Sequence, residues 1–164
     1  MLRILAVSVV AVALFAEPTG AAIEPCVGLA RPVDGSVERG FAPTGRYSGH
    51  WGIDLGVPAG TDIQAAGPGA VSFAGTVAGN VTVTVDHGGG LRTSYSYLSA
   101  VAVERGDRVV ESTILGTSGS SHGSPALHFS VRVGTTYVDP LQIVGCRITR
   151  PWRGLRLVPV RDSR

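Results

Sequence analysis

Four segments of the chain alternate between apolar and polar residues with a period of two, which is typical of half-buried β-strands. They span residues 69–75, 80–86, 91–97 and 126–133. Glycine-rich turns separate them, and Asp86-His-Gly-Gly-Gly90 supplies the positive φ angles that a tight hairpin connection requires. No stretch of ten or more residues shows a convincing 3.6-residue period. The pattern therefore predicts an all-β, mainly antiparallel domain with little helix.

Length and composition restrict the class of protein. The 164 residues suit one domain preceded by a leader, which excludes an enzyme with separate cofactor and substrate lobes. The net charge is only +2 and charged residues make up 16% of the chain, below the usual level of about 25%. A general nucleic-acid binder is therefore disfavoured.

Residues 1–22 have the organisation of a secretory signal peptide. Arg3 precedes an apolar run over residues 4–16, and small residues follow at 20–22. The run is shorter than the roughly 20 residues that span a bilayer. We expect a secreted protein, extracellular or associated with the cell envelope, with no transmembrane span after leader cleavage; an uncleaved N-terminal anchor is the alternative.

Two cysteines, Cys26 and Cys146, flank the expected domain at residues 23–146. An even pair in an exported protein favours a disulfide, which stabilises a loop of this length by about 4 to 5 kcal/mol in the chain-entropy model. Two unpaired thiols are the alternative. Residues 147–164 form a basic C-terminal tail, expected to be solvated, with contact to an anionic envelope polymer as its functional alternative.

The strongest chemical signal is Gly49-His-Trp-Gly-Ile-Asp-Leu55. On an extended chain the side chains of residues four apart point the same way, so His50 and Asp54 would lie side by side. An imidazole beside a carboxylate suits a divalent metal, and zinc is preferred where nitrogen ligands are present. By itself the pair is also compatible with a surface histidine and a turn aspartate.

The last alternating segment adds a second histidine. Its polar face carries Ala126, His128, Ser130 and Arg132. Its other face is expected to point into the core and carries Leu127, Phe129, Val131 and Val133. Alone, His128 would be an ordinary hydrogen-bonded histidine. With His50 and Asp54 it completes a triplet, and catalytic zinc sites keep three protein ligands with one open position.

The motifs together resemble the lysostaphin-type (LytM) zinc metallopeptidases, which cut peptide cross-links of bacterial peptidoglycan. The resemblance covers about residues 31–142. Its motifs are Gly49-His-Trp-Gly-Ile-Asp-Leu-Gly-Val-Pro-Ala-Gly60, Val85-Asp-His-Gly-Gly-Gly90, Tyr95-Ser-Tyr-Leu-Ser99, Gly106-Asp107, Gly116-Thr-Ser-Gly119 and Leu127-His-Phe-Ser-Val-Arg132. It implies a compact β-sheet domain with a metal-binding groove, zinc held by His50, Asp54 and His128, and peptidoglycan as partner.

Two positions depart from the pattern of active family members. A Tyr-x-His-Leu segment and a His-x-His segment of the family supply two histidines that are not ligands and act on the attacking water. Tyr97 and Ala126 stand at these positions. A general acid or base typically raises the rate of the catalysed reaction about 10²- to 10⁴-fold. The resemblance therefore indicates a catalytically degenerate member, a pseudoenzyme whose hydrolysis is severely weakened or absent.

Few residues could replace the missing histidines. Tyr97 keeps a hydroxyl that could donate to an oxyanion, and His122 is the nearby imidazole that could substitute, although a plain loop histidine is its simplest interpretation. His87, in the glycine-rich turn, is expected to be structural.

Three hypotheses for the function follow. The first is a secreted domain acting at peptidoglycan without cutting it, because degenerate members of the family bind the cell wall or regulate a cell-wall hydrolase. The second is an active zinc metalloendopeptidase with an altered catalytic shell. The third is an exported β domain without metal function, which three intact ligands disfavour.

Overall fold

The computed structural model describes residues 28–45 and 48–145, and nearly all of its regular structure is strand. The strands are β1 (Ser36–Arg39), β2 (Ala42–Pro43), β3 (Gly49–His50), β4 (Ile53–Gly56), β5 (Asp62–Gln64), β6 (Gly69–Val77), β7 (Asn80–Gly88), β8 (Leu91–Val101), β9 (Arg108–Val109), β10 (Ile114–Ser121), β11 (Ser124–Val133) and β12 (Thr136–Val138). A single 3-10 turn, η1 (Pro140–Gln142), is the helical element of the described residues.

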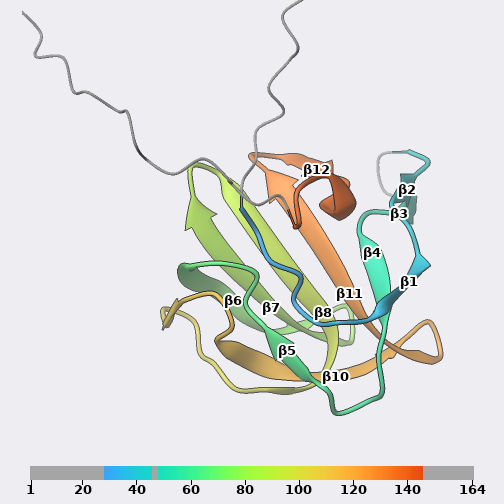
Figure 1. Ribbon diagram of the computed structural model, residues 1–164, viewed down its shortest axis with the longest axis horizontal. Coiled ribbons are helices and arrows are strands. Elements are labelled where there is room, and N and C mark those ends of the chain that lie inside the picture. Colours follow the sequence, from blue (N-terminus) through green and yellow to red (C-terminus); the bar gives the residue numbers. More distant parts are fainter. Residues whose placement is uncertain (1–27, 46–47, 146–164) are drawn as a thin grey trace, which may run out of the picture.

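Ten of these strands form one antiparallel sheet in the order β1-β4-β11-β10-β8-β7-β6-β9. Strand β8 also pairs directly with β11, β12 pairs with β11, and β5 pairs with β10. Figure 1 shows the long strands β6, β7, β8 and β11 side by side, with β10 across one end of them. Strands β2 and β3 form a separate two-stranded ladder. The expected antiparallel all-β domain is confirmed.

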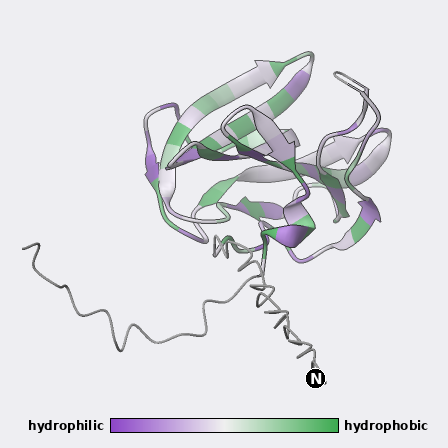
Figure 2. Cartoon of the chain, turned by 90° about the horizontal axis from the view of Figure 1, so that it is seen from above, coloured by the Kyte–Doolittle hydropathy of each residue, from purple (hydrophilic) through white to green (hydrophobic). Residues whose placement is uncertain are grey.

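The core lies under one face of the long strands. Leu127, Phe129 and Val131 of β11 are each 0% exposed, which confirms the predicted core face of that segment. Val133, expected on the same face, is 45% exposed. It is the last residue of β11, and the strand has left the core there, so that part of the prediction is wrong. Figure 2 shows hydrophobic and hydrophilic residues alternating along the strands.

The predicted hairpin between the second and third segments is present, with a shorter turn than expected. Asp86, His87 and Gly88 belong to β7, and only Gly89 and Gly90 connect it to β8. Both glycines have positive φ angles, 58° and 82°, as a two-residue hairpin turn requires.

His87 has a structural place, as expected. Its Nδ1 lies 2.7 Å from the carbonyl oxygen of Pro68, and its Nε2 lies 2.8 Å from Oγ1 of Thr93. The ring thereby ties the loop before β6 to the interior of β8.

The two ends of the described domain meet. Leu29 pairs with Val144 in an isolated parallel bridge, and the amide of Gly145 donates to the carbonyl oxygen of Leu29 over 2.9 Å. The predicted leader (1–22), Cys26, Cys146 and the basic tail (147–164) lie outside the described residues. Within the described part, no helix is long and apolar enough to cross a membrane.

Candidate metal centre

Three predicted ligands converge on one point at the edge of the core. Oδ1 of Asp54 lies 3.1 Å from Nε2 of His50 and 2.8 Å from Nδ1 of His128, and the two ring nitrogens are 3.1 Å apart. Two ligands of a tetrahedral zinc ion, each about 2.0–2.1 Å from it, are separated by about 3.3 Å. The three atoms therefore form a triangle of nearly the size that such an ion needs.

The register of the sheet produces this convergence. Asp54 of β4 pairs with His128 of β11, and on its other side with Arg39 of β1. Directly opposed residues of an antiparallel pair project from the same face. His50 arrives from β3, across a bend at Trp51 and Gly52. The expectation that His50 and Asp54 lie side by side is confirmed, but the chain between them is bent and not continuously extended.

A backbone carbonyl fixes the state of His50. Nδ1 of His50 lies 2.8 Å from the carbonyl oxygen of Gly40, and because a carbonyl oxygen only accepts, Nδ1 carries the proton. In the neutral imidazole, Nε2 is then a bare lone pair, and it faces a carboxylate oxygen of Asp54. Two lone pairs facing each other in a buried site need a proton or a metal cation between them. Gly40 acts through its backbone carbonyl, and no sequence motif marks such a contribution.

The charges around Asp54 keep it ionised. Burial raises the pKa of this carboxyl, but hydrogen bonding and charge from His128, followed by His50, outweigh burial and lower the pKa below its usual value. The side chain is only 6% exposed. A buried carboxylate flanked by two imidazoles is a donor set suited to zinc.

Gly52 makes the close approach between the bend and His128 possible. A Cβ atom at this position would lie 2.8 Å from Nε2 of His128 and 2.5 Å from the carbonyl oxygen of Phe129. The glycine therefore lets the β3–β4 bend pass directly over the ring of His128.

His122 lies against the cluster, closer than a plain loop histidine would. Its Nε2 is 4.0 Å from Oδ2 of Asp54 and 3.3 Å from an Nη atom of Arg39. His50, Asp54 and His122 can each offer one ligand atom within 4.8 Å of the others. The tighter triangle formed with His128 is the better three-ligand set, and His122 stands beside it as a fourth group.

Tyr97 and Ala126, the two positions where the family resemblance led us to look for histidines, both lie beside the cluster. The Tyr97 ring centroid is 5.7 Å from that of His122 and 6.2 Å from that of His128, and its backbone has a positive φ of 65°. Ala126 precedes His128 by two residues on β11 and is 3% exposed.

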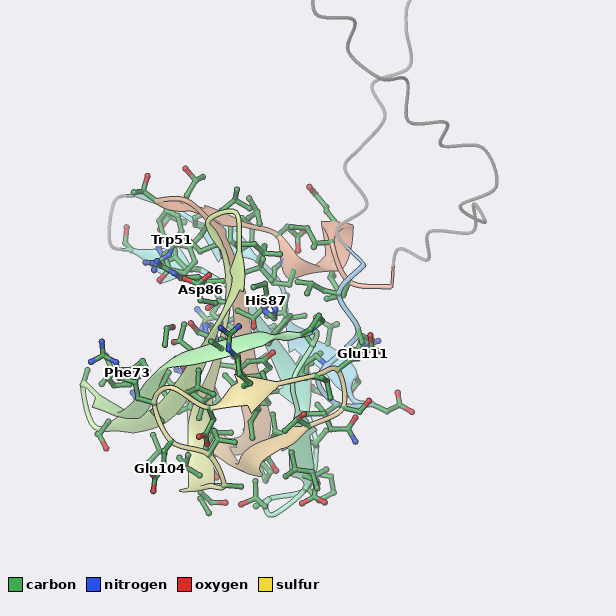
Figure 3. The ribbon with its side chains drawn as sticks, turned by 90° about the vertical axis from the view of Figure 1, so that its left-hand side faces the viewer. Trp51, Phe73, Asp86, His87, Glu104 and Glu111 are labelled. Carbon is green, nitrogen blue, oxygen red and sulfur yellow. The ribbon has the colours of Figure 1, made fainter. Side chains whose placement is uncertain are left out.

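Two hollows open on either side of the cluster. The larger, of about 570 Å³, is lined by residues including Glu38, Arg39 and Ala126, and by Ser121, whose buried hydroxyl has no partner among the described residues. The second, of about 510 Å³, reaches along the open face of β7, β8 and β11. Figure 3 labels two of its aromatic lining residues, Trp51 and Phe73, which lie well apart.

Serine and threonine hydroxyls line part of the second hollow. Oγ1 of Thr82 is 3.1 Å from Oγ of Ser96, and Oγ1 of Thr84 is 2.9 Å from Oγ of Ser94. These cross-strand pairs on β7 and β8 leave a polar surface leading away from the histidines.

The antiparallel fold and the His/Asp/His cluster define a metallopeptidase-like β domain of the lysostaphin type. The chain belongs to peptidase family M23, whose model matches residues 48–140, more than half of the chain. The resemblance stated from the sequence is thereby confirmed at the level of the family.

Curated relatives cover the same region. An uncharacterized protein of Mycobacterium tuberculosis is 38% identical over 104 residues, covering 58% of this chain and 41% of the relative. The DD-carboxypeptidase/endopeptidase Mpg of Neisseria gonorrhoeae is 33% identical over 97 residues, covering 57% and 22%. Stage II sporulation protein Q of Bacillus subtilis is 33% identical over 109 residues, covering 60% and 37%. The chain thus spans less than half the length of these relatives.

Solved structures agree on the fold. Lysostaphin from Staphylococcus simulans has a TM-score of 0.62 at 26% identity, covering 71% of this chain and 53% of that one. A zinc containing peptidase from Vibrio cholerae has a TM-score of 0.61 at 28% identity, and the match covers 68% of this chain and 39% of that one. A chain of the SpoIIIAH and SpoIIQ complex has a TM-score of 0.62 at 30% identity, and the match covers 69% of this chain and 97% of that one.

Proposed function

We propose that this domain binds zinc and acts at bacterial peptidoglycan without hydrolysing it, as a cell-wall-binding or hydrolase-regulating protein. One observation carries the proposal. The three candidate ligands converge within 3.1 Å of one another, while the two positions where active family members have further histidines hold Tyr97 and Ala126.

The residues fit zinc. His50 through Nε2, His128 through Nδ1 and Asp54 through Oδ1 would hold the ion, and Gly40 would orient His50 as an outer hydrogen-bond acceptor. In a site of this kind zinc supplies Lewis-acid chemistry, by polarising a carbonyl oxygen and activating water. A zinc containing peptidase among the structural neighbours supports this choice of metal.

The residues around the ligands are poor in proton-transfer groups. Ala126 has no functional group, and the side chain of Tyr97 offers a hydroxyl where an imidazole would be needed. Without a positioned base, hydrolysis loses about 10²- to 10⁴-fold for each missing contribution, and paired losses do not simply add. The ligands remain useful because they hold the groove in shape.

The hydroxyl-lined hollow beside the cluster supports binding of a polar polymer. Serine and threonine hydroxyls both donate and accept, so the Thr82–Ser96 and Thr84–Ser94 pairs can exchange hydrogen bonds with a peptide backbone or sugar hydroxyls. Trp51, which also lines this hollow, offers an apolar face.

A secreted or envelope-associated location and a protein partner are parts of the same proposal. The SpoIIIAH and SpoIIQ complex is a precedent among the neighbours for a member of this fold that assembles with another protein.

A second candidate function is an active zinc metalloendopeptidase that cleaves peptide cross-links, and the position of His122 favours it. This imidazole lies 4.0 Å from Asp54 and beside Tyr97, so it could act as the base that positions 97 and 126 lack.

Mass spectrometry of purified peptidoglycan incubated with the zinc-loaded protein separates the two functions. We expect sedimentation with the wall and no released peptides from the native protein, and released peptides from the Tyr97→His/Ala126→His double variant. The double variant with His128→Ala added is the control and should release none. Zinc-dependent release by the native protein would establish the second function instead.

A further inference from the structure

We propose that His122 is a fourth protein ligand of the metal and that the hairpin turn between β10 and β11 thereby closes the site. The inference rests on the proposed zinc binding and deepens it, because a closed site accounts for a metal centre that holds zinc without using it for hydrolysis.

The turn holds His122 in a defined place. Ser121 pairs with Ser124, so His122 and Gly123 alone connect β10 to β11. Their φ angles are 52° and 85°, both positive, as in the tight two-residue turns that match the twist of a hairpin. Histidine tolerates this conformation better than most residues with a side chain. His122 is therefore carried by a short, rigid turn, and little backbone entropy is lost when it binds.

The imidazole of His122 faces the other ligands. Its Nε2 lies 4.0 Å from Oδ2 of Asp54, the carboxylate oxygen that His50 and His128 leave free. Its ring centroid is 6.3 Å from that of His50. The side chain is 51% exposed, so a rotamer adjustment can bring Nε2 to the ion without disturbing the core. Tyr97 covers another side of the ring, at 5.7 Å between centroids.

Arg39 reveals which nitrogen of His122 has the free lone pair. A guanidinium only donates, and an Nη atom of Arg39 lies 3.3 Å from Nε2 of His122. Nε2 is therefore an acceptor, and in the neutral ring the proton is on Nδ1. The lone pair on Nε2 of His122 therefore already faces a cation, the guanidinium of Arg39. Arg39 on β1 is paired with Asp54 on β4, which places this guanidinium beside the cluster. On metal binding, Nε2 would exchange the guanidinium for the ion.

Four protein ligands change what the centre can do. Structural zinc sites are closed, with four protein ligands, whereas catalytic sites keep one position for water or substrate. With His122 bound, no lone pair of this residue remains to act as a base, and peptide release by the Tyr97→His/Ala126→His variant would require His122 to leave the ion. Coordination and general-base action by His122 are therefore alternatives, and they can be distinguished.

The experiment uses cobalt and azide as probes on the full chain. Cobalt(II) replaces zinc, and its visible absorption reports the coordination number. We expect the native protein to give the intense bands of a four-coordinate site that azide does not alter. The variant His122→Asn, which keeps a residue compatible with positive φ, should bind zinc at least about tenfold more weakly, with a spectrum that azide changes. His87→Asn is the matched control, because the hydrogen bonds of His87 go to Pro68 and Thr93 and not to the cluster, and it should behave as native.

A second variant tests the exchange of cations. Arg39→Gln removes the guanidinium from Nε2 and should tighten zinc binding in the native background, but less so in His122→Asn. Long-range ¹H–¹⁵N spectra of the histidines should show zinc-dependent shifts at Nε2 of His122.

Each other outcome overturns the inference. If His122→Asn leaves the spectrum, the azide response and the affinity unchanged, the site has three protein ligands while the proposed zinc binding stands. If the native protein binds neither zinc nor cobalt, both proposals fail. If native protein releases wall peptides and His122→Asn does not, while its metal affinity is native, His122 is a base.

Discussion

Asp54 and His128 face each other across neighbouring strands, and a ring nitrogen and a carboxylate oxygen lie 2.8 Å apart although 74 positions separate the two residues. The pairing register of β4 and β11 sets this distance. Any slip of one residue would turn one side chain to the other face. The metal centre is therefore as well defined as the sheet itself.

Replacing the carboxylate by an amide tests the centre directly. Asp54→Asn keeps the size of the side chain but removes its negative charge, so zinc affinity should fall by more than the roughly 10- to 100-fold that loss of an outer-sphere partner costs. Isothermal titration with zinc measures it. Asp86→Asn is the matched control, because Asp86 forms an ion pair with Arg92 at the surface. Equal losses in the two variants would mean that Asp54 is not a ligand.

The close approach at Gly52 gives a second prediction. Gly52→Ala places a methyl group 2.8 Å from Nε2 of His128, so the ring must move and zinc affinity should fall at least about tenfold, with little change in secondary structure. Gly40→Ala serves as control, since it keeps the backbone carbonyl that accepts from His50 and a Cβ atom there meets nothing within 4 Å. Unchanged zinc binding in Gly52→Ala would show that the position of His128 is not critical.

The buried phenol of Tyr95 should make the folded domain less stable at alkaline pH. Burial raises the pKa of this phenol from 10 to about 12, although hydrogen bonds with Thr93 and the Ala66 amide oppose the shift. Between pH 10 and 12 the unfolded chain loses the proton while the folded chain keeps it, so the free energy of unfolding should fall, by about 2–3 kcal/mol in total. Below pH 10 this stability is fully present.

Urea unfolding at several pH values measures that slope. In Tyr95→Phe the slope between pH 10 and 12 should flatten, while the baseline stability at pH 8 drops by about 1–3 kcal/mol because the Ala66 amide loses its acceptor. Tyr137→Phe alters an exposed tyrosine and should retain the native slope. A native slope in Tyr95→Phe would assign the effect to another group.

The meeting of Leu29 and Val144 supports the expected disulfide between Cys26 and Cys146. Cys26 precedes Leu29 by three residues in the sequence and Cys146 follows Val144 by two, so each cysteine is within a few residues of a pair that is in contact. We expect the intact mass of the oxidised protein to be lower by two hydrogens than after reduction. Cys146→Ser should lower the free energy of unfolding by about 2–5 kcal/mol under oxidising conditions. If reduction leaves the native stability unchanged, the pair does not form.

The sequence predicted most of what lies on alternating strands. His128 was placed on the polar face of β11 because Leu127, Phe129 and Val131 mark the opposite face, and this placement is confirmed. Strand β10 was not predicted, because after Ile114 and Leu115 it contains only glycine, serine and threonine and so has no alternation of apolar and polar residues. Its pairing with β5, β8 and β11, and the complete burial of Ser118, decide its structure. Such contacts have no local signature.

The surroundings of the ligands were harder to predict for the same reason. Arg39 and His122 are 83 positions apart, and neither belongs to a motif that would join them. The turn at His122 and Gly123 contains an ordinary polar pair whose geometry is set by the strands on either side. A sequence pattern marks residues whose neighbours in sequence share their role. Arg39 has no such neighbours, and His122 was singled out only as an imidazole close to the last alternating segment.

The adjacency of Leu29 and Val144 has a consequence for protein engineering. Because the two ends of the folded unit touch, they could be joined by a short linker and new ends opened elsewhere, for example at the exposed Ala78–Gly79 turn between β6 and β7. A circular permutant of this kind would keep every strand pairing while moving both attachment points to the far end of the β6–β7 hairpin. The domain could then be displayed in a different orientation without altering its metal centre.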